Sequence, residues 1–199
     1  PSVRCATPTP PYKVRGGLQP WPAIPEIASI RYVERSDACV MDAHLHPGQV
    51  EITCLECGHI SWWVDGRVLD VTGGEIHVSL PGEPHGGVDD IFEPSAFYGV
   101  RLRLPEDGRG FLGLCEAESM ALVDSLLQLP RLFTASCQVH SQFERLLAAS
   151  AVEQTPVHTA RLRAQLVTLL LEVVAAARSG TAEQTPSSPV ERALQLMRQ

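Results

Sequence analysis

Apolar and polar residues alternate with a period of two through several short stretches between residues 28 and 104. Successive side chains of a β-strand point to opposite faces, so this alternation predicts strands with one buried face. The pairs Asp65-Gly66 and Gly73-Gly74 separate stretches and suit tight turns, because glycine tolerates positive φ. We expect antiparallel strands at 28–35, 39–44, 50–57, 59–64, 67–71, 76–80 and 96–104.

The pattern changes near Cys115, where glutamate, alanine, leucine and methionine replace β-branched and turn residues. Apolar residues then recur at spacings of three and four, which predicts helices at 116–129, 139–151 and 156–179. The third helix has the clearest ends, since Thr155 can cap it, Pro156 suits its first position and Gly180 can end it. The chain is therefore predicted to be mainly β with a helical C-terminal part.

The helix at 156–179 carries more apolar residues than one packed face requires. One stripe consists of Leu162, Leu166, Leu169, Leu170 and Val173, and a second consists of Val167, Leu171 and Val174. One stripe suffices to pack a helix against a sheet. The second predicts a homodimer in which this helix meets its copy across a twofold axis. The alternative is burial between helices of the same chain.

Both ends of the chain differ in composition from the middle. Residues 1–27 include seven prolines and are expected to form an extended arm without helix or central strand. Tyr12 and Trp21 are candidates to anchor this arm, which either acts as a linker or covers the barrel mouth. Residues 181–199 combine a small, polar linker with an amphipathic stretch, VERALQLMRQ, that indicates the start of a further domain.

Charge, hydropathy and cysteine content narrow the classes of function. The formal net charge of −7 matches polyanionic nucleic acid poorly. No apolar run approaches membrane-spanning length and no signal-peptide pattern is present, so we expect a cytoplasmic location and no membrane partner. The six scattered cysteines are typical of a reduced protein. Cys54 and Cys57 should point to opposite faces of a strand, which argues against a redox or zinc CxxC site.

Four residues form the candidate site. His44 and His46 share a face if their segment is a strand, and Glu51 follows near the start of the next strand. If Glu51 faces inward, Thr53, Leu55 and Cys57 do so too. A rigid turn, Pro81-Gly82-Glu83-Pro84, then delivers His85. Three imidazoles and one carboxylate suit a divalent metal, with zinc favoured and iron, manganese or nickel as alternatives.

These residues resemble the two motifs of the cupin family. His44, His46, Glu51 and Gly58 fit the spacing of the first motif, and Gly74, Gly82 and His85 fit the second. Two positions depart from the second motif: Leu80 stands where proline is usual, and Asp89 stands where asparagine is usual. The resemblance covers residues 28–104 and implies a double-stranded β-helix, or jelly-roll, barrel. We therefore divide the chain into an arm (1–27), a cupin barrel (28–114), a helical dimerisation segment (115–180) and a linker region (181–199).

Other side chains are candidates to line the barrel. Trp62 and Trp63 are adjacent on a strand, so one ring should point inward and offer a stacking surface to a ligand. Arg101 and Arg103 share the polar face of the strand at 96–104 and are candidates for an anionic or hydroxylated ligand, unless that face is solvated. The remaining histidines fit no ligand position and are expected at the surface or in the core, although His77 could border the pocket; they are His59, His77, His140 and His158.

The order of segments is similar to that of the AraC family of bacterial transcription regulators. A cupin barrel, amphipathic helices, a linker and a short amphipathic helix occur in that order. The resemblance implies a non-enzymatic domain that binds a small polar effector such as a sugar or carboxylate, with DNA contacted by a domain beyond Gln199. The alternatives are a metal-dependent cupin enzyme, such as a sugar isomerase, epimerase or dioxygenase, and a structural dimerisation module with a vestigial site.

Overall fold

The structure is a computed structural model that describes residues 12–17, 21–153 and 155–181. Its strands are β1 (Tyr12–Gly17), β2 (Ile27–Arg35), β3 (Cys39–Val40), β4 (Gln49–Val64), β5 (Arg67–Thr72), β6 (Glu75–Ser79), β7 (His85–Gly87), β8 (Ile91–Phe92), β9 (Ser95–Arg103) and β10 (Leu132–Thr134). Its α-helices are α1 (Glu116–Leu127), α2 (Cys137–Ser150) and α3 (Pro156–Thr181), and short 3-10 turns lie at Val88–Asp90 and Phe111–Gly113. No helix of the described part is long and apolar enough to span a membrane.

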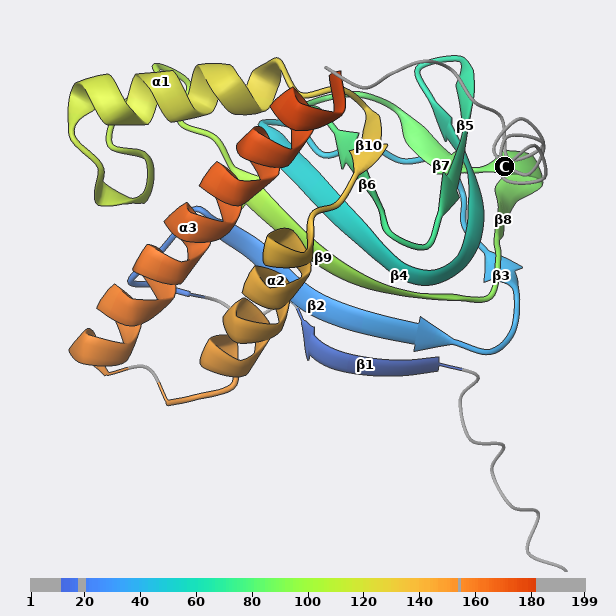
Figure 1. Cartoon of the computed structure of the whole chain (residues 1–199), viewed down its shortest axis with the longest axis horizontal. Helices are drawn as coiled ribbons and strands as arrows, with labels where there is room; N and C mark the ends of the chain where they lie inside the picture. The colour runs from blue at the N-terminus through green and yellow to red at the C-terminus, as the bar shows by residue number, and fades with distance from the viewer. Residues whose placement is uncertain (1–11, 18–20, 154, 182–199) are drawn as a thin grey trace, which may run out of the picture.

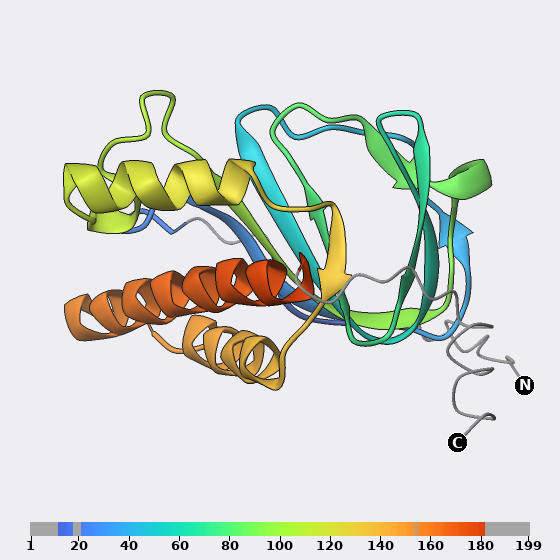
Figure 2. The same ribbon diagram turned by 45° about the horizontal axis from the view of Figure 1, so that its top comes forward.

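The strands form a two-sheet antiparallel barrel, with the helices beside it (Figure 1). The main sheet has the order β1-β2-β9-β4-β6-β10. The second half of β4 leaves this sheet and pairs with β5 and β7, while β3 pairs with β8. Figure 2 shows the helices against the outer side of the main sheet, away from the barrel interior. The prediction of a mainly β barrel followed by helices is confirmed.

Strand β4 is one continuous strand of 16 residues, so the predicted break at Gly58 is wrong. The register on β9 shifts between Leu55 and Cys57, which places a β-bulge at Glu56. Gly58 has φ of +94°, and a Cβ there would lie 2.6 Å from the carbonyl oxygen of Pro94. A bulge and a positive-φ glycine bend a strand without ending it. The bulge also overturns the prediction that Cys57 faces inward with Glu51, because Cys57 is exposed.

The two cysteines of the CxxC stretch occupy different environments. Cys54 is 1% exposed in the main core, whereas Cys57 is exposed at the bend. Burial raises the pKa of the Cys54 thiol to about 12. A thiol with so high a pKa is a poor nucleophile and metal ligand.

Four strands were not predicted, namely β1, β10 and the short β7 and β8, and one predicted strand is shorter than expected. β1 lies inside the proline-rich arm and pairs with the edge of β2, a position where neighbouring prolines interrupt no central ladder. β10 lies inside the region expected to be helical and pairs with β6. Its three residues are too few to show an alternating pattern. The strand expected at 39–44 ends at Val40, and beyond it only His44 makes an isolated bridge.

Helix α3 buries its first apolar stripe completely. Leu162, Leu166, Leu169, Leu170 and Val173 are all 2% exposed or less. The second stripe divides, because Val174 is buried, Val167 is partly buried and Leu171 is 56% exposed. The start of the helix is capped as predicted, with the Thr155 hydroxyl accepting the His158 backbone N–H at 3.2 Å. The core thus fills the space between the helices and the outer face of the main sheet.

Candidate metal centre

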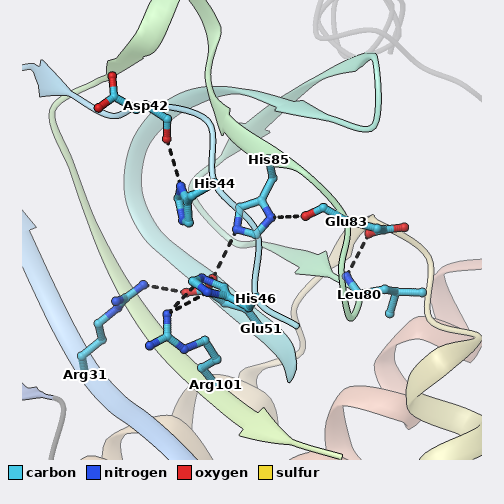
Figure 3. A network of polar contacts seen from close by, with 9 residues as sticks. All are labelled: Arg31, Asp42, His44, His46, Glu51, Leu80, Glu83, His85 and Arg101. Atoms are coloured by element: carbon cyan, nitrogen blue, oxygen red, sulfur yellow. Dashed lines mark hydrogen bonds and ion pairs between the residues drawn. The ribbon is translucent and has the colours of Figure 1, made fainter. Parts of the chain in front are cut away.

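The four predicted ligands come together at one end of the barrel interior (Figure 3). Their potential ligand atoms all lie within 4.8 Å of one another. Glu51 stands on β4, His85 begins β7, and His44 and His46 lie on the segment between β3 and β4. Glu51 Oε2 is 3.2 Å from His46 Nε2 and 3.6 Å from His85 Nε2. Residues 41 positions apart in sequence, His44 and His85, therefore face one point.

Backbone hydrogen bonds hold the histidine segments together. The N–H of His44 donates to the carbonyl of His85, and the N–H of His85 donates back to His44, both at 2.8 Å. The carbonyl of His46 accepts from Gln49 and Gly82, at 3.3 and 3.1 Å. His44 and His46 are thus positioned by this bridge and by turn bonds, not by the regular strand that the sequence suggested.

Carbonyl groups orient two of the imidazole rings. His44 Nδ1 lies 3.0 Å from the Asp42 carbonyl, and His85 Nδ1 lies 2.8 Å from the Glu83 carbonyl. A carbonyl only accepts, so each Nδ1 carries the proton and each Nε2 keeps a lone pair. Hydrogen bonds of this kind typically support metal-bound histidines. The Nε2 atom of His85 is buried and has no hydrogen-bond partner in the described part of the chain.

The turn before His85 is fixed in the same way. The Glu83 carboxylate accepts the Leu80 backbone N–H at 2.9 Å and is paired with the Arg131 guanidinium. Arg131 lies just before β10, so the edge strand that the sequence did not reveal also anchors the loop that carries His85. This connection makes the position of His85 depend on the helical half of the chain.

Positive side chains surround the carboxylate of the cluster. Arg31 Nη2 lies 2.6 Å from Glu51 Oε1, and Arg101 Nη1 lies 2.9 Å from His46 Nε2. Burial alone would raise the pKa of Glu51, but close contacts with the imidazoles of His46 and His85 and the charge of Arg31 hold this pKa well below its usual value. Burial lowers the pKa of His44, reinforced by the neighbouring His85 and His46. At neutral pH the cluster therefore presents a carboxylate and a neutral His44.

The donor set fits a divalent metal. Three imidazoles and one carboxylate are borderline donors, and the orphaned Nε2 of His85 is a lone pair with no other use in the described structure. An ion held by His44, His46, Glu51 and His85 would take the His46 lone pair that now contacts Arg101. Such an ion supplies Lewis acidity and coordination positions for oxygen atoms of a ligand.

The cluster opens onto a cavity of about 50 Å³ between the two sheets. Its walls change from polar to apolar away from the cluster. The polar lining residues are Arg31, His44, Glu51, Thr53, His77 and Ser79; the others are Met41, Ile60, Trp62, Val71, Phe92 and Phe97. Small-molecule sites commonly combine apolar walls with a few placed polar groups.

The other predicted site residues have different positions. Trp62 lines the cavity, with its ring centroid 5.6 Å from that of His77, whereas Trp63 does not line it. Arg101 contacts His46, but Arg103 donates to the backbone carbonyls of Pro25 and Ile27, at 2.8 and 3.1 Å. Arg103 therefore ties β9 to the start of β2 and does not join the cluster.

Sequence reasoning missed Arg31, which reaches Glu51 from β2. Arg31 pairs with Gly99 of β9, and a side chain on Gly99 would lie 3.3 Å from Arg31 Nε. The absence of that side chain gives the guanidinium room to reach the cluster. The only signal in the sequence is a charged residue within the mainly apolar stretch 27–33, IASIRYV. His77, noted earlier only as a residue that could border the pocket, lines it and is 4% exposed.

Barrel, cluster and cavity together define a cupin-type ligand-binding domain with a candidate metal centre. Residues 26–181 match the family model described as the AraC-like ligand binding domain, so the chain belongs to that family. A comparison with curated protein sequences finds no match.

Solved structures resemble parts of the chain at low identity. KdgF from a Halomonas species is 15% identical, with a TM-score of 0.37 and coverage of 51% of this chain and 87% of the other. An RmlC-like cupin from Shewanella frigidimarina is 18% identical, with a TM-score of 0.33 and coverage of 41% and 70%. The Cupin_2 domain of an XRE family transcriptional regulator from Enterobacter cloacae is 12% identical, with a TM-score of 0.36 and coverage of 48% and 99%.

Proposed function

We propose that this chain is the metal-dependent effector-sensing part of an AraC-type transcription regulator. The observation that carries the proposal is the four-residue cluster at the end of a cavity, in a chain of the AraC-like ligand binding family. The ion, with zinc favoured, presents open coordination positions to oxygen atoms of a small effector such as a sugar or carboxylate. The barrel walls select the rest of the molecule. The domain senses the effector and does not transform it.

The arrangement of layers supports a signalling role. The main sheet faces the cavity on one side and the helices on the other. At the bulge of β4, the Glu56 carboxylate accepts the Tyr32 hydroxyl at 2.6 Å and lies 3.4 Å from His140 Nε2 on α2. An effector that prefers one bend of β4 would thereby favour one position of α2. Binding can shift the equilibrium between the two arrangements only by the difference between the effector's binding free energies for them.

We propose that α3 also forms the homodimer contact, over residues 156–179. Leu171 is 56% exposed and Val157 is 77% exposed, and both lie outside the buried stripe. DNA would be contacted through a domain outside residues 1–199, in the cytoplasm. DNA contact by another domain is consistent with the net charge of −7 on this chain, which does not favour binding to DNA.

Elemental analysis tests the metal part of the proposal. Protein purified without added chelator should hold about one zinc per chain, and Glu51→Gln and His85→Ala should lose most of it, because each removes one of four ligands. His59→Ala is the matched control, since His59 is an exposed imidazole outside the cluster. Equal metal content in wild type and in both site variants would refute the assignment.

The regulatory part is tested with the longest natural protein that contains this chain. Its affinity for DNA upstream of its own gene should change when zinc is removed with a chelator and recover when zinc is returned. Turnover of a sugar or a catechol by the zinc- or iron-loaded chain would show an enzyme and overturn the sensor role. DNA binding that is indifferent to metal would also count against it.

A further inference from the structure

The polar end of the cavity is positively charged, unlike the chain as a whole. Arg31 lines this end and contacts Glu51, while Arg101 lies beside it against His46, which also contacts Glu51. Two guanidinium groups against one carboxylate leave an excess of one positive charge, and a divalent ion would add two. A chain with a net charge of −7 thus concentrates positive charge at this point. Such a focus favours an anionic ligand.

Several buried polar atoms near the cluster have no hydrogen-bond partner in the described structure. They are Arg31 Nε, Trp62 Nε1, His77 Nε2 and Ser79 Oγ, and all four side chains line the cavity. His77 and Ser79 are 4% and 2% exposed, so bulk water does not satisfy them. The arginine and tryptophan atoms can only donate, and serine can donate. A ligand that supplies acceptor oxygens would therefore satisfy these donor atoms.

Strand register explains why these groups face one place. Glu51 pairs with Ser79 and Thr53 pairs with His77 on neighbouring strands, so the four side chains form two rows on the inner face. Gly99 pairs with both Thr53 and Arg31, and its missing side chain leaves the space that the Arg31 guanidinium enters. The donors consequently surround the same volume, next to the metal ligands.

The remainder of the cavity is apolar and small. Phe92, Phe97, Ile60 and Val71 belong to one buried cluster, and Met41 and Trp62 pack against it. A sugar carries hydroxyl groups on all sides, and those facing this cluster would lose their hydrogen bonds to water without gaining others, which disfavours binding. A cavity of about 50 Å³ holds roughly four water-sized groups at 10–15 Å³ each. The ligand is therefore compact, with one polar end.

We infer that the effector is a compact monocarboxylate with a short aliphatic body. The inference rests on the proposed function and narrows its ligand from polar small molecules in general. The carboxylate lies at the metal-ligand cluster, within reach of Arg31 Nε, and the body lies against Phe92 and Phe97. Trp62, His77 and Ser79 determine specificity by donating to the ligand's oxygens.

Isothermal titration of the zinc-loaded chain tests the inference. The probes are propionate and butyrate, their uncharged counterparts propionamide and butyramide, and D-glucose. At least one carboxylate should bind, and its amide should bind at least tenfold more weakly, because only the acid offers two anionic acceptor oxygens. Glucose should give no heat. Equal binding of acid and amide, binding of glucose alone, or no binding by either acid would overturn the inference.

Variants locate the binding site. Arg31→Gln should weaken carboxylate binding at least tenfold, while Arg67→Gln, an equal charge change on the exposed part of β5, should leave it unchanged. Trp62→Phe keeps an aromatic ring and removes one donor, and should weaken binding severalfold with an unaltered circular dichroism spectrum. This second variant keeps the test decisive if Arg31→Gln folds poorly. Unchanged affinity in a folded Trp62→Phe would contradict the assigned role of its indole N–H.

The same titration separates this inference from the metal proposal. Carboxylate binding that persists after zinc removal would support the ligand class and refute metal dependence. Zinc-dependent glucose binding without carboxylate binding would do the reverse. Each hypothesis can therefore fail without the other.

Discussion

Replacing His77 with glutamine tests how strongly the barrel interior excludes a charge. Burial lowers the pKa of His77 from 6.5 to about 3, with a further contribution from nearby His85. Below pH 6.5 the unfolded chain binds a proton at this position, and the folded chain does not until the pH approaches 3. The contribution of neutral His77 to the free energy of unfolding is therefore fully present above pH 6.5 and is lost as the pH falls from 6.5 toward 3.

The size of the effect follows from these values. Between pH 7 and pH 5 the unfolded chain takes up a proton at His77 and the folded chain does not. Over this interval the uptake lowers the free energy of unfolding by the equivalent of about 1.4 pH units, and at about 1.36 kcal/mol per unit this is about 2 kcal/mol. The free energy of unfolding of the wild type should fall by this amount more than that of His77→Gln. The side chain is 4% exposed, so solvent screening does not reduce the figure appreciably.

Urea unfolding at pH 7, 6 and 5 measures the difference. A chelator is present throughout, so that metal release does not add its own pH dependence. His59→Gln is the control for the loss of an exposed imidazole. If wild type and His77→Gln lose stability in parallel from pH 7 to pH 5, then His77 is not buried in its neutral form and the description of the cavity is wrong.

Three further changes test the packing by urea unfolding. Leu166→Ala should cost about 3 kcal/mol, because this side chain is fully buried, and Thr168→Ala, at an exposed position of the same helix, should stay within about 0.5 kcal/mol; equal losses would contradict the orientation of α3. Ser119→Ala should cost about 2 kcal/mol, because the buried hydroxyl accepts the Phe111 N–H at 2.8 Å and donates to the Gly108 carbonyl. Ser125→Ala, at a partly exposed position of the same helix, is its control, and an equally small loss in both would refute the contact. Gly87→Ala should cost about 3 kcal/mol, because its Cβ would overlap the backbone of Ile91, whereas Gly66→Ala has open space and only backbone strain of roughly 1–2 kcal/mol; a tolerated Gly87→Ala would refute the close approach of β7 and β8.

Most of the barrel could be predicted because several of its strands show alternation in the sequence and its turns carry glycine and proline. The candidate ligands could be predicted as a set because their spacing follows a family pattern. The way in which their rings are oriented could not be predicted. His44 and His85 are held by backbone carbonyls of Asp42 and Glu83, which no side-chain pattern reveals. The bulge at Glu56 was equally invisible, because an extra residue leaves the local alternation almost unchanged until the register with β9 is known.

Arginine positions show the limit of strand parity. Arg101 and Arg103 share a face of β9, yet one meets His46 and the other bonds backbone carbonyls at the barrel end. The difference lies in depth along the barrel axis, which depends on the neighbouring strands. Arg31 enters the cluster only because β2 places it opposite a glycine of β9. Which arginines reach the cluster therefore depends on pairing between strands that are far apart in the sequence, and the local sequence pattern does not reveal this pairing.

Strand β4 also has a consequence for how the chain folds during synthesis. It belongs to both sheets, and one of its edges is completed only by β9, some 40 residues later in the sequence. Until residues 95–103 leave the ribosome, a strand of 16 residues exposes unpaired backbone groups. Long-range pairing of this kind slows folding and leaves edges open to other chains. Slow translation just before Ser95 would prolong this vulnerable interval, and the yield of soluble protein should therefore depend on how quickly β9 follows β4.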